Sequence, residues 1–192
     1  MIQNKNLLRR VVCVAALSVL CLSSWTPGNA TTLQQLSLDE MINQSTAIVR
    51  GRVGNSTGVF HGSNIYTHYS VQVIETLKST SQTPTSGTIE VAVPGGSVDG
   101  LQQSVAGAPV LESGSEYVLF LWTSSKGTTL VIGLTQGLFQ LTQDSSGTAV
   151  LDREATSEVM LDGQGRVVQD SATHMTLDAL RNRIRQQQGA TK

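Results

Sequence analysis

The segment from Gly54 to Gly58 has the spacing G-x-S-x-G, with Ser56 at its centre. In α/β-type hydrolases this spacing forms a sharp strand-to-helix turn that exposes a nucleophilic serine. The residues that follow, 59–63, show no helical periodicity and include Gly62. We therefore expect a loop or hairpin that interrupts the preceding strand, and a serine hydrolase using Ser56 is the least favoured function that we consider.

Three histidines supply all the imidazole groups of the chain: His61, His68 and His174. Their spacing does not match a metal-binding pattern such as H-E-x-x-H, and the chain has no cysteine beyond residue 30. We therefore predict neither a metal site nor a cofactor. His68 alternates with apolar residues of a predicted strand, which places it on a solvated outer face.

The acidic residues do not form an evident catalytic pair, because four of the glutamates are spread along the chain: Glu75, Glu90, Glu112 and Glu116. Glu75 has the same parity as Val71 and Val73 in a predicted strand. A β-bulge that turns the Glu75 side chain outward is favoured over a buried functional acid.

The best candidate for a binding site is the glycine-rich segment 97–114, which we predict to be a long loop. Loops without their own secondary structure in a compact domain often bind ligands or partners. A simple connector between strands is an equally good interpretation. The candidate binding residues lie in and just before this segment: Pro94, Gly95, Gly96, Asp99, Gly107 and Pro109.

Apolar residues alternate with polar ones in several short segments, which predicts β-strands. Residues 117–122 (YVLFLW) are apolar at every position and are expected to form a central strand buried on both faces. The strand predicted over 65–77 is unusually long and is expected to bend near Ile74. The other strands are predicted at 47–53, 65–77, 89–93, 130–134 and 138–141, with a polar turn around Pro84, a hairpin at 144–147 and a further turn at 162–165.

Helix signals occur at both ends of this strand-rich region. Ser37 and Glu40 form a capping box ahead of a short helix over 37–45, whose apolar face is expected to consist of Leu38, Met41 and Ile42. A second helix is predicted over 176–188, with Thr176 as its cap and a buried stripe of three residues. These three are Leu177, Leu180 and Ile184.

No helical pattern lies between the strands to carry parallel crossovers, so the sequence predicts a mostly β fold. We expect a closed or partly open antiparallel OB-like barrel with a short N-terminal helix and a C-terminal helix. Residues 31–192 are expected to form a single domain. Within it we assign the barrel core to 37–142, a hairpin extension to 143–175 and the C-terminal helix to 176–188.

Several strand motifs occur in a familiar order: STAIVRGRV over 45–53, YTHYSVQVIETLK over 66–78, GTIEV over 87–91, PGG over 94–96 and GSEYVLFL over 114–121. This pattern resembles the OB-like barrels of the tissue-inhibitor-of-metalloproteinases and netrin-module type, and exported bacterial proteins with the same pattern. The resemblance covers residues 37–122. It implies an OB-like fold and, as one function, protease inhibition. In those inhibitors an N-terminal cysteine binds the protease zinc, whereas the mature chain here is expected to begin at Thr31.

Residues 1–30 have the features of a secretory signal peptide that is cleaved after Ala30. Lys5, Arg9 and Arg10 precede the weakly polar to apolar run 11–24, and the segment contains no acidic residue. Fourteen helical residues span only about 21 Å, less than the roughly 30 Å of a membrane core, so an anchor is disfavoured. A lipoprotein is also disfavoured, because a small residue does not directly precede Cys21.

Removal of this segment would leave a mildly acidic domain without cysteine. Both cysteines, Cys13 and Cys21, lie within 1–30. The same segment contains three of the 13 Lys and Arg residues and none of the 14 Asp and Glu residues, so residues 31–192 have a net charge of −4. The absence of disulfides suggests a bacterial protein, exported to the periplasm or the extracellular space. The acidity argues against a nucleic-acid partner, and no later segment is predicted to cross a membrane.

These observations favour a non-catalytic binding module over an enzyme. Its partner is expected to be a secreted or envelope protein, such as a protease. A protease inhibitor or protease-associated protein is the alternative.

Overall fold

The computed structural model describes residues 32–80 and 86–190 and is mostly β, with about half of these described residues in strands. The chain divides into two units, 1–30 and 31–192, and only the second is described below. The predicted signal segment and most of the predicted turn around Pro84 lie outside the described residues. Within the described ranges, no helix combines the length and apolar character needed to cross a membrane.

The two helices form where the capping signals predict them. Helix α2 (Leu38–Gln44) begins after Ser37, whose Oγ accepts from the Glu40 amide at 3.2 Å while Glu40 Oε2 accepts from the Ser37 amide at 2.8 Å. Helix α3 (Leu177–Ala190) begins after Thr176, whose Oγ1 accepts from the Ala179 amide at 3.1 Å. The capping box and the predicted cap of the C-terminal helix are both confirmed.

Thirteen strands and one short 3-10 helix make up the rest of the regular structure in the described ranges. Their bounds are β1 (Leu33–Gln34), β2 (Ala47–His61), β3 (Asn64–Ser79), β4 (Thr88–Pro94), β5 (Gly96–Val98), β6 (Leu101–Gln103), β7 (Glu116–Thr123), β8 (Thr129–Val131), η1 (Leu134–Gly137), β9 (Leu138–Gln143), β10 (Ala149–Arg153), β11 (Met160–Leu161), β12 (Val167–Val168) and β13 (Thr173–Thr176).

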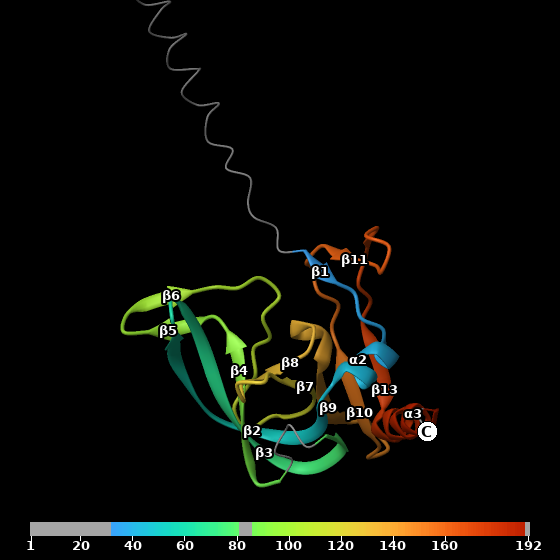
Figure 1. The fold of residues 1–192 in the computed structure, drawn as a ribbon. Coiled ribbons are helices and arrows are strands. Elements are labelled where there is room, and N and C mark those ends of the chain that lie inside the picture. Colours follow the sequence, from blue (N-terminus) through green and yellow to red (C-terminus); the bar gives the residue numbers. More distant parts are fainter. Residues whose placement is uncertain (1–31, 81–85, 191–192) are drawn as a thin grey trace, which may run out of the picture. The chain divides into compact units, whose positions relative to one another are not determined.

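The main sheet has eight strands in the order β13-β10-β9-β7-β2-β3-β4-β8, and β7 also pairs with β8 (Figure 1). The sheet therefore curls back on itself through the five strands β7, β2, β3, β4 and β8, and it is partly closed. The closing pair, Ala92 with Leu130, is parallel. The prediction of purely antiparallel pairing is wrong at this point, because a ring of five strands whose other four neighbouring pairs are antiparallel must close with one parallel pair.

Strand β7 lies between two apolar cores, which explains why successive residues from Tyr117 to Leu121 are all apolar. Tyr117, Leu119 and Leu121 point into the curled sheet with residues of β2, β3 and β4. Val118 and Phe120 point to the opposite face, where α2 and α3 cover the sheet. All five side chains are buried, so the prediction of a central strand buried on both faces is confirmed for 117–121; it is wrong for Trp122, the last residue of the predicted run, which is 42% exposed.

A bulge in β3 turns Glu75 away from the interior, as predicted. Arg50 pairs with Glu75 and Gly51 pairs with Val73, so Ile74 is the extra residue of β3. The Glu75 carboxylate instead accepts from the guanidinium of Arg181 on α3, at 2.6 and 2.9 Å. The bulge thereby connects the curled sheet to the C-terminal helix.

Three local predictions are wrong. Residues 55–58 do not break the strand, because β2 absorbs the extra residues 54–55 opposite Ser70 in a bulge of its own and continues to His61. The segment 97–114 is not a single loop, because its first part forms the β5–β6 hairpin. The strand expected over 130–134 ends at Val131 and is followed by η1.

Candidate functional site

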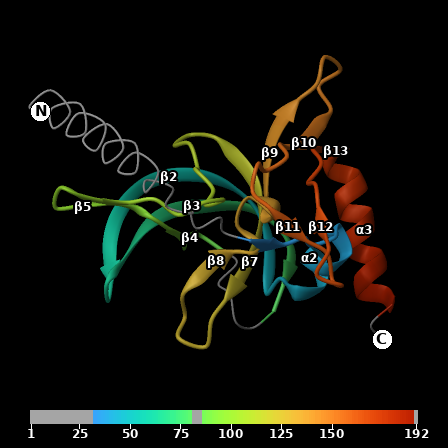
Figure 2. The same ribbon diagram turned by 90° about the horizontal axis from the view of Figure 1, so that it is seen from above.

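The outer halves of β2 and β3 and the β5–β6 hairpin form a projection that we call the arm, defined as residues 54–70 and 95–103. Figure 1 shows β5 and β6 lying against the curved outer parts of β2 and β3, away from the helices, and Figure 2 shows the same hairpin from above. The arm contains three of the six predicted binding residues, Gly95, Gly96 and Asp99, and Pro94 directly precedes it. It is therefore the first candidate for a binding surface.

Within the arm, the β5–β6 hairpin is held against β3 by main-chain and side-chain hydrogen bonds. The Gly95 amide donates to the Ile65 carbonyl at 2.8 Å, and the Ile65 amide donates to Gln103 Oε1 at 2.6 Å. The Thr67 hydroxyl donates to the Gly95 carbonyl at 2.8 Å. Ile65 is buried beneath the hairpin, so the hairpin has a fixed position on β3.

Two glycine features allow this close approach. Gly95 and Gly96 have φ angles of 96° and 132°, in the region that favours glycine, and they reverse the chain after β4. A Cβ atom on Gly58 would lie 2.2 Å from the Ser97 carbonyl oxygen. Only a residue without a side chain therefore lets β5 lie over β2.

The arm exposes apolar side chains and carries little charge. Leu101 is 61% exposed and Phe60 is 42% exposed. Among residues 53–74 and 91–111, Asp99 is the only Asp, Glu, Lys or Arg. Depletion of charge together with exposed large apolar groups is typical of the core of a protein–protein interface.

The structure separates the predicted binding residues into two groups. Pro94, Gly95, Gly96 and Asp99 lie at the base or in the turn of the β5–β6 hairpin, and Asp99 is in the turn with a φ of 50°. Gly107 and Pro109 lie elsewhere: the Gly107 carbonyl accepts from the Thr135 amide at 3.3 Å, and Pro109 is buried.

Ser56 lies in an extended strand and not on a strand-to-helix turn. It pairs with Tyr69, whereas the adjacent Thr57 pairs with His68. Because successive side chains of a strand point to opposite faces, Ser56 and His68 lie on opposite faces of the hairpin. The G-x-S-x-G spacing does not form a nucleophile elbow here.

The face of the arm opposite the β5–β6 hairpin brings two histidines together. The Nε2 atoms of His61 and His68 are 3.0 Å apart, and His68 Nδ1 lies 2.6 Å from Glu90 Oε1. An open hollow of about 330 Å³ lies beside them, lined also by Lys126, Thr128 and Thr129. Sequence reasoning missed this group, although a turn at 62–63 would have placed both histidines on one face.

No protein family matches the sequence of this chain, and no curated protein matches it either.

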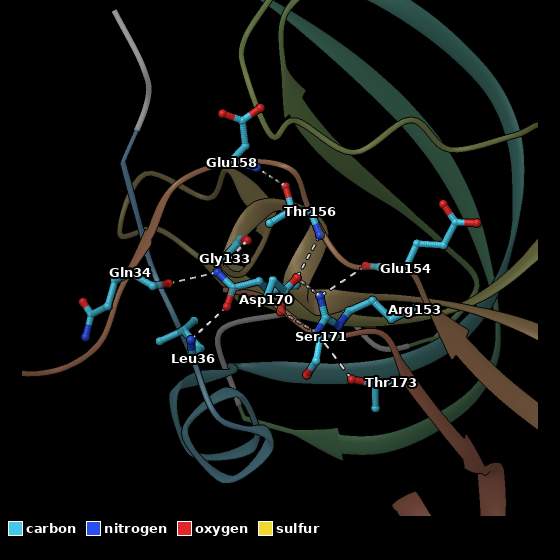
Figure 3. Close-up of polar contacts among 11 residues, drawn as sticks. Gln34, Leu36, Gly133, Arg153, Glu154, Thr156, Glu158, Asp170, Ser171 and Thr173 are labelled. Atoms are coloured by element: carbon cyan, nitrogen blue, oxygen red, sulfur yellow. Dashed lines mark hydrogen bonds and ion pairs between the residues drawn. The ribbon is translucent and has the colours of Figure 1, made fainter. Parts of the chain in front are cut away.

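The most buried ion pair lies on the other side of the sheet and has a structural role. Figure 3 shows Arg153 bonded to both oxygens of Asp170, at 2.6 and 2.9 Å, and to the Ser171 carbonyl at 2.7 Å. Asp170 also accepts from the Thr156 amide at 2.9 Å. These contacts fix the connections between β10, β11 and β13.

Near this ion pair, Gln136 ties the N-terminal segment to η1. Its side chain accepts from the Leu36 amide at 2.8 Å and donates to the Gln34 carbonyl at 2.9 Å. Gln136 is buried, and its side chain also donates to the Gly133 carbonyl at 3.3 Å, so all three of these partners are main-chain groups. It therefore stabilises the fold and is not available to a ligand.

Four of the arginines on β2 and α3 are paired with carboxylates, which argues against a basic binding surface there. Arg50 and Arg52 both bind Glu116, at 2.7 and 2.5 Å. These hydrogen bonds, from Arg50 above all, hold the pKa of Glu116 below its usual value despite its partial burial. On α3, Arg183 binds Asp39 with its Nε at 2.6 Å.

Proposed function

We propose that this protein is an exported, non-catalytic binding module whose arm contacts a secreted or envelope protein. The observation that carries the proposal is the composition of the arm surface, which exposes Phe60 and Leu101 in a region where Asp99 is the only charged residue. Such a surface favours a protein partner over nucleic acid or an anionic membrane, both of which require clustered Lys and Arg.

The same proposal includes the finer assignment of the fold as an OB-like barrel. Five strands form the ring β7-β2-β3-β4-β8, and one residue pair closes it. A five-stranded, partly open barrel is typical of this class, whose loops and strand faces bind ligands. The fold by itself does not specify the partner, so the arm surface supplies the functional part of the proposal.

The position of Ser56 supports a binding role over the hydrolase alternative. The face of β2 and β3 that carries Ser56 is the face on which β5 lies at Gly58, while the histidines point to the opposite face. A serine without a nearby base is a weak nucleophile. Ser56 therefore lacks the partner that acyl-transfer chemistry requires.

A capture experiment with matched variants tests the proposal. The purified, immobilised protein is incubated with the periplasmic and culture-supernatant fractions of its source organism, and bound proteins are identified. Leu101→Asp places a charge on the arm, and Val167→Asp makes the same type of change at a residue of β12 that is 72% exposed. Loss of one buried leucine contact, worth about 1.5–3 kcal/mol, lowers affinity by roughly tenfold or more.

We expect the original chain and Val167→Asp to recover the same partner, and Leu101→Asp to recover at least tenfold less of it. Repeated recovery of no specific protein by the original chain would count against a binding module. Equal recovery by Leu101→Asp would move the contact surface away from the arm.

A further inference from the structure

The two imidazole rings of the arm converge through their Nε2 atoms at a separation of 3.0 Å. His61 is the last residue of β2 and His68 lies in β3, so the hairpin turn at 62–63 brings together residues seven positions apart. The ring planes are within 13° of parallel. The hairpin thus presents two nitrogen donors at one place.

Glu90 fixes the orientation and the tautomer of one of these rings. Its Oε1 lies 2.6 Å from His68 Nδ1, and a carboxylate oxygen accepts, so Nδ1 carries the hydrogen. The neutral His68 ring then has its lone pair on Nε2, which accepts a hydrogen bond from the Nε2–H of His61 at 3.0 Å; a metal ion bound between the two nitrogens would take the place of that hydrogen. A carboxylate on the far nitrogen of an imidazole is the usual second partner of a histidine that binds a metal ion.

From this arrangement we propose that His61 and His68 bind one divalent transition-metal ion of the Zn²⁺ or Cu²⁺ class through their Nε2 atoms. When two imidazole nitrogens each lie about 2.0–2.1 Å from one ion and the nitrogen–metal–nitrogen angle is about 90–109°, the two nitrogens are roughly 2.9–3.4 Å apart. The observed Nε2–Nε2 distance of 3.0 Å falls within that range. Imidazole donors select such ions over Ca²⁺ and Mg²⁺, which prefer oxygen.

The site has two protein ligands. In the described part of the chain, no group of three or more His, Cys, Asp or Glu side chains is arranged to hold a metal ion. The remaining coordination positions therefore belong to water or to an added ligand. Two hollows meet at His61 and give this room: one of about 330 Å³ and one of about 250 Å³, the latter lined by Asn64 and Tyr66.

Lys126 also lines the larger hollow, and its charge opposes a cation. It lies in the turn between β7 and β8 and is exposed, so its ammonium group can extend into water. Glu90, also exposed, contributes a compensating negative charge beside His68. The site is therefore open and exchangeable, unlike a closed structural zinc centre.

The test is a titration of the purified protein, free of any polyhistidine tag, with Zn²⁺ and separately with Cu²⁺. Affinity is measured by isothermal titration calorimetry, and the Zn²⁺-bound nitrogens are identified by ¹⁵N imidazole NMR. His174 provides a matched control, because its Nδ1 also lies 2.6 Å from a carboxylate, that of Asp152, on a different part of the sheet. The variants are His61→Gln, Glu90→Gln and His174→Gln.

We expect one equivalent of metal to bind, with Nε2 resonances of His61 and His68 shifted. Glu90→Gln should weaken binding about 10–100-fold, as loss of a second-shell carboxylate does elsewhere, and His61→Gln should weaken it by more. His174→Gln should bind as the original chain does. Equal affinity of His61→Gln and the original chain, or no binding to the original chain, would overturn the proposal. His61 and Glu90 are exposed, so neither variant is expected to unfold the protein.

Discussion

Asp170→Asn is expected to lower the free energy of unfolding by about 3–5 kcal/mol, the usual effect of breaking a buried ion pair. The side chains of Arg153 and Asp170 are only 9% and 3% exposed. Asparagine keeps the shape but removes the charge, so the Arg153 guanidinium remains buried without a counter-ion. Urea unfolding followed by far-UV circular dichroism measures the change.

Arg166→Gln is the control for this substitution. Arg166 also forms an ion pair with an aspartate, Asp162, at 2.6 Å, but its side chain is 75% exposed. Exposed pairs of this kind contribute about 0–1 kcal/mol. Equal stability losses in Asp170→Asn and Arg166→Gln would contradict the structural role of the buried pair.

The Asp170 pair also predicts a dependence of stability on pH. Burial by itself raises the pKa of Asp170, but hydrogen bonds from Arg153 and from the Thr156 amide outweigh it, so the pKa lies below its ordinary value of 3.8. A lowered pKa in the folded state stabilises the protein above the ordinary value, and this contribution is lost as the pH falls below 3.8 through the folded value. Asp170→Asn should therefore lose less stability than the original chain over that acid range.

Phe120→Ala should be comparably destabilising, by about 3–5 kcal/mol, because it removes a large side chain from a packed core. Phe120 is fully buried, and its ring centroid lies 5.5 Å from that of Phe139 beneath the two helices. The resulting cavity lies between β7 and β9, where the sheet and the helical layer meet. Thermal and urea unfolding of the purified variant measure the loss.

The same substitution at Phe60 is the matched control. Phe60 lies on the arm and is 42% exposed, so Phe60→Ala should change stability by no more than about 0.5 kcal/mol. A loss below about 1 kcal/mol for Phe120→Ala would contradict the two-core arrangement around β7.

Local signals in the sequence were sufficient to predict the elements whose formation depends on nearby residues. The capping box of Ser37 and Glu40 predicts α2, the stripe of Leu177, Leu180 and Ile184 predicts the buried face of α3, and the uninterrupted apolar run predicts β7. The parity of Glu75 predicts the bulge at Ile74, because an acidic side chain inside the curled sheet would be unpaired.

The arm could not be predicted in this way, because long-range contacts form it. Polar residues at 54–58 predict a break in the strand, yet the bulge at 54–55 and the pairing with β3 keep that segment extended. The segment after Gly96 has weak alternation. Its hairpin is stabilised by hydrogen bonds of Gly95 and Gln103 to Ile65 and Thr67, which are 28 to 38 positions away along the chain. The contact of the two histidines depends on the register of this same hairpin.

The most direct test of the proposed binding surface is hydrogen–deuterium exchange of the protein with and without its captured partner. If the arm binds that partner, exchange should slow in 56–61 and 96–103, the segments that contain Phe60 and Leu101. Slowed exchange confined to 133–170, with the arm unchanged, would contradict the account and place the interface on the side of the Arg153–Asp170 pair.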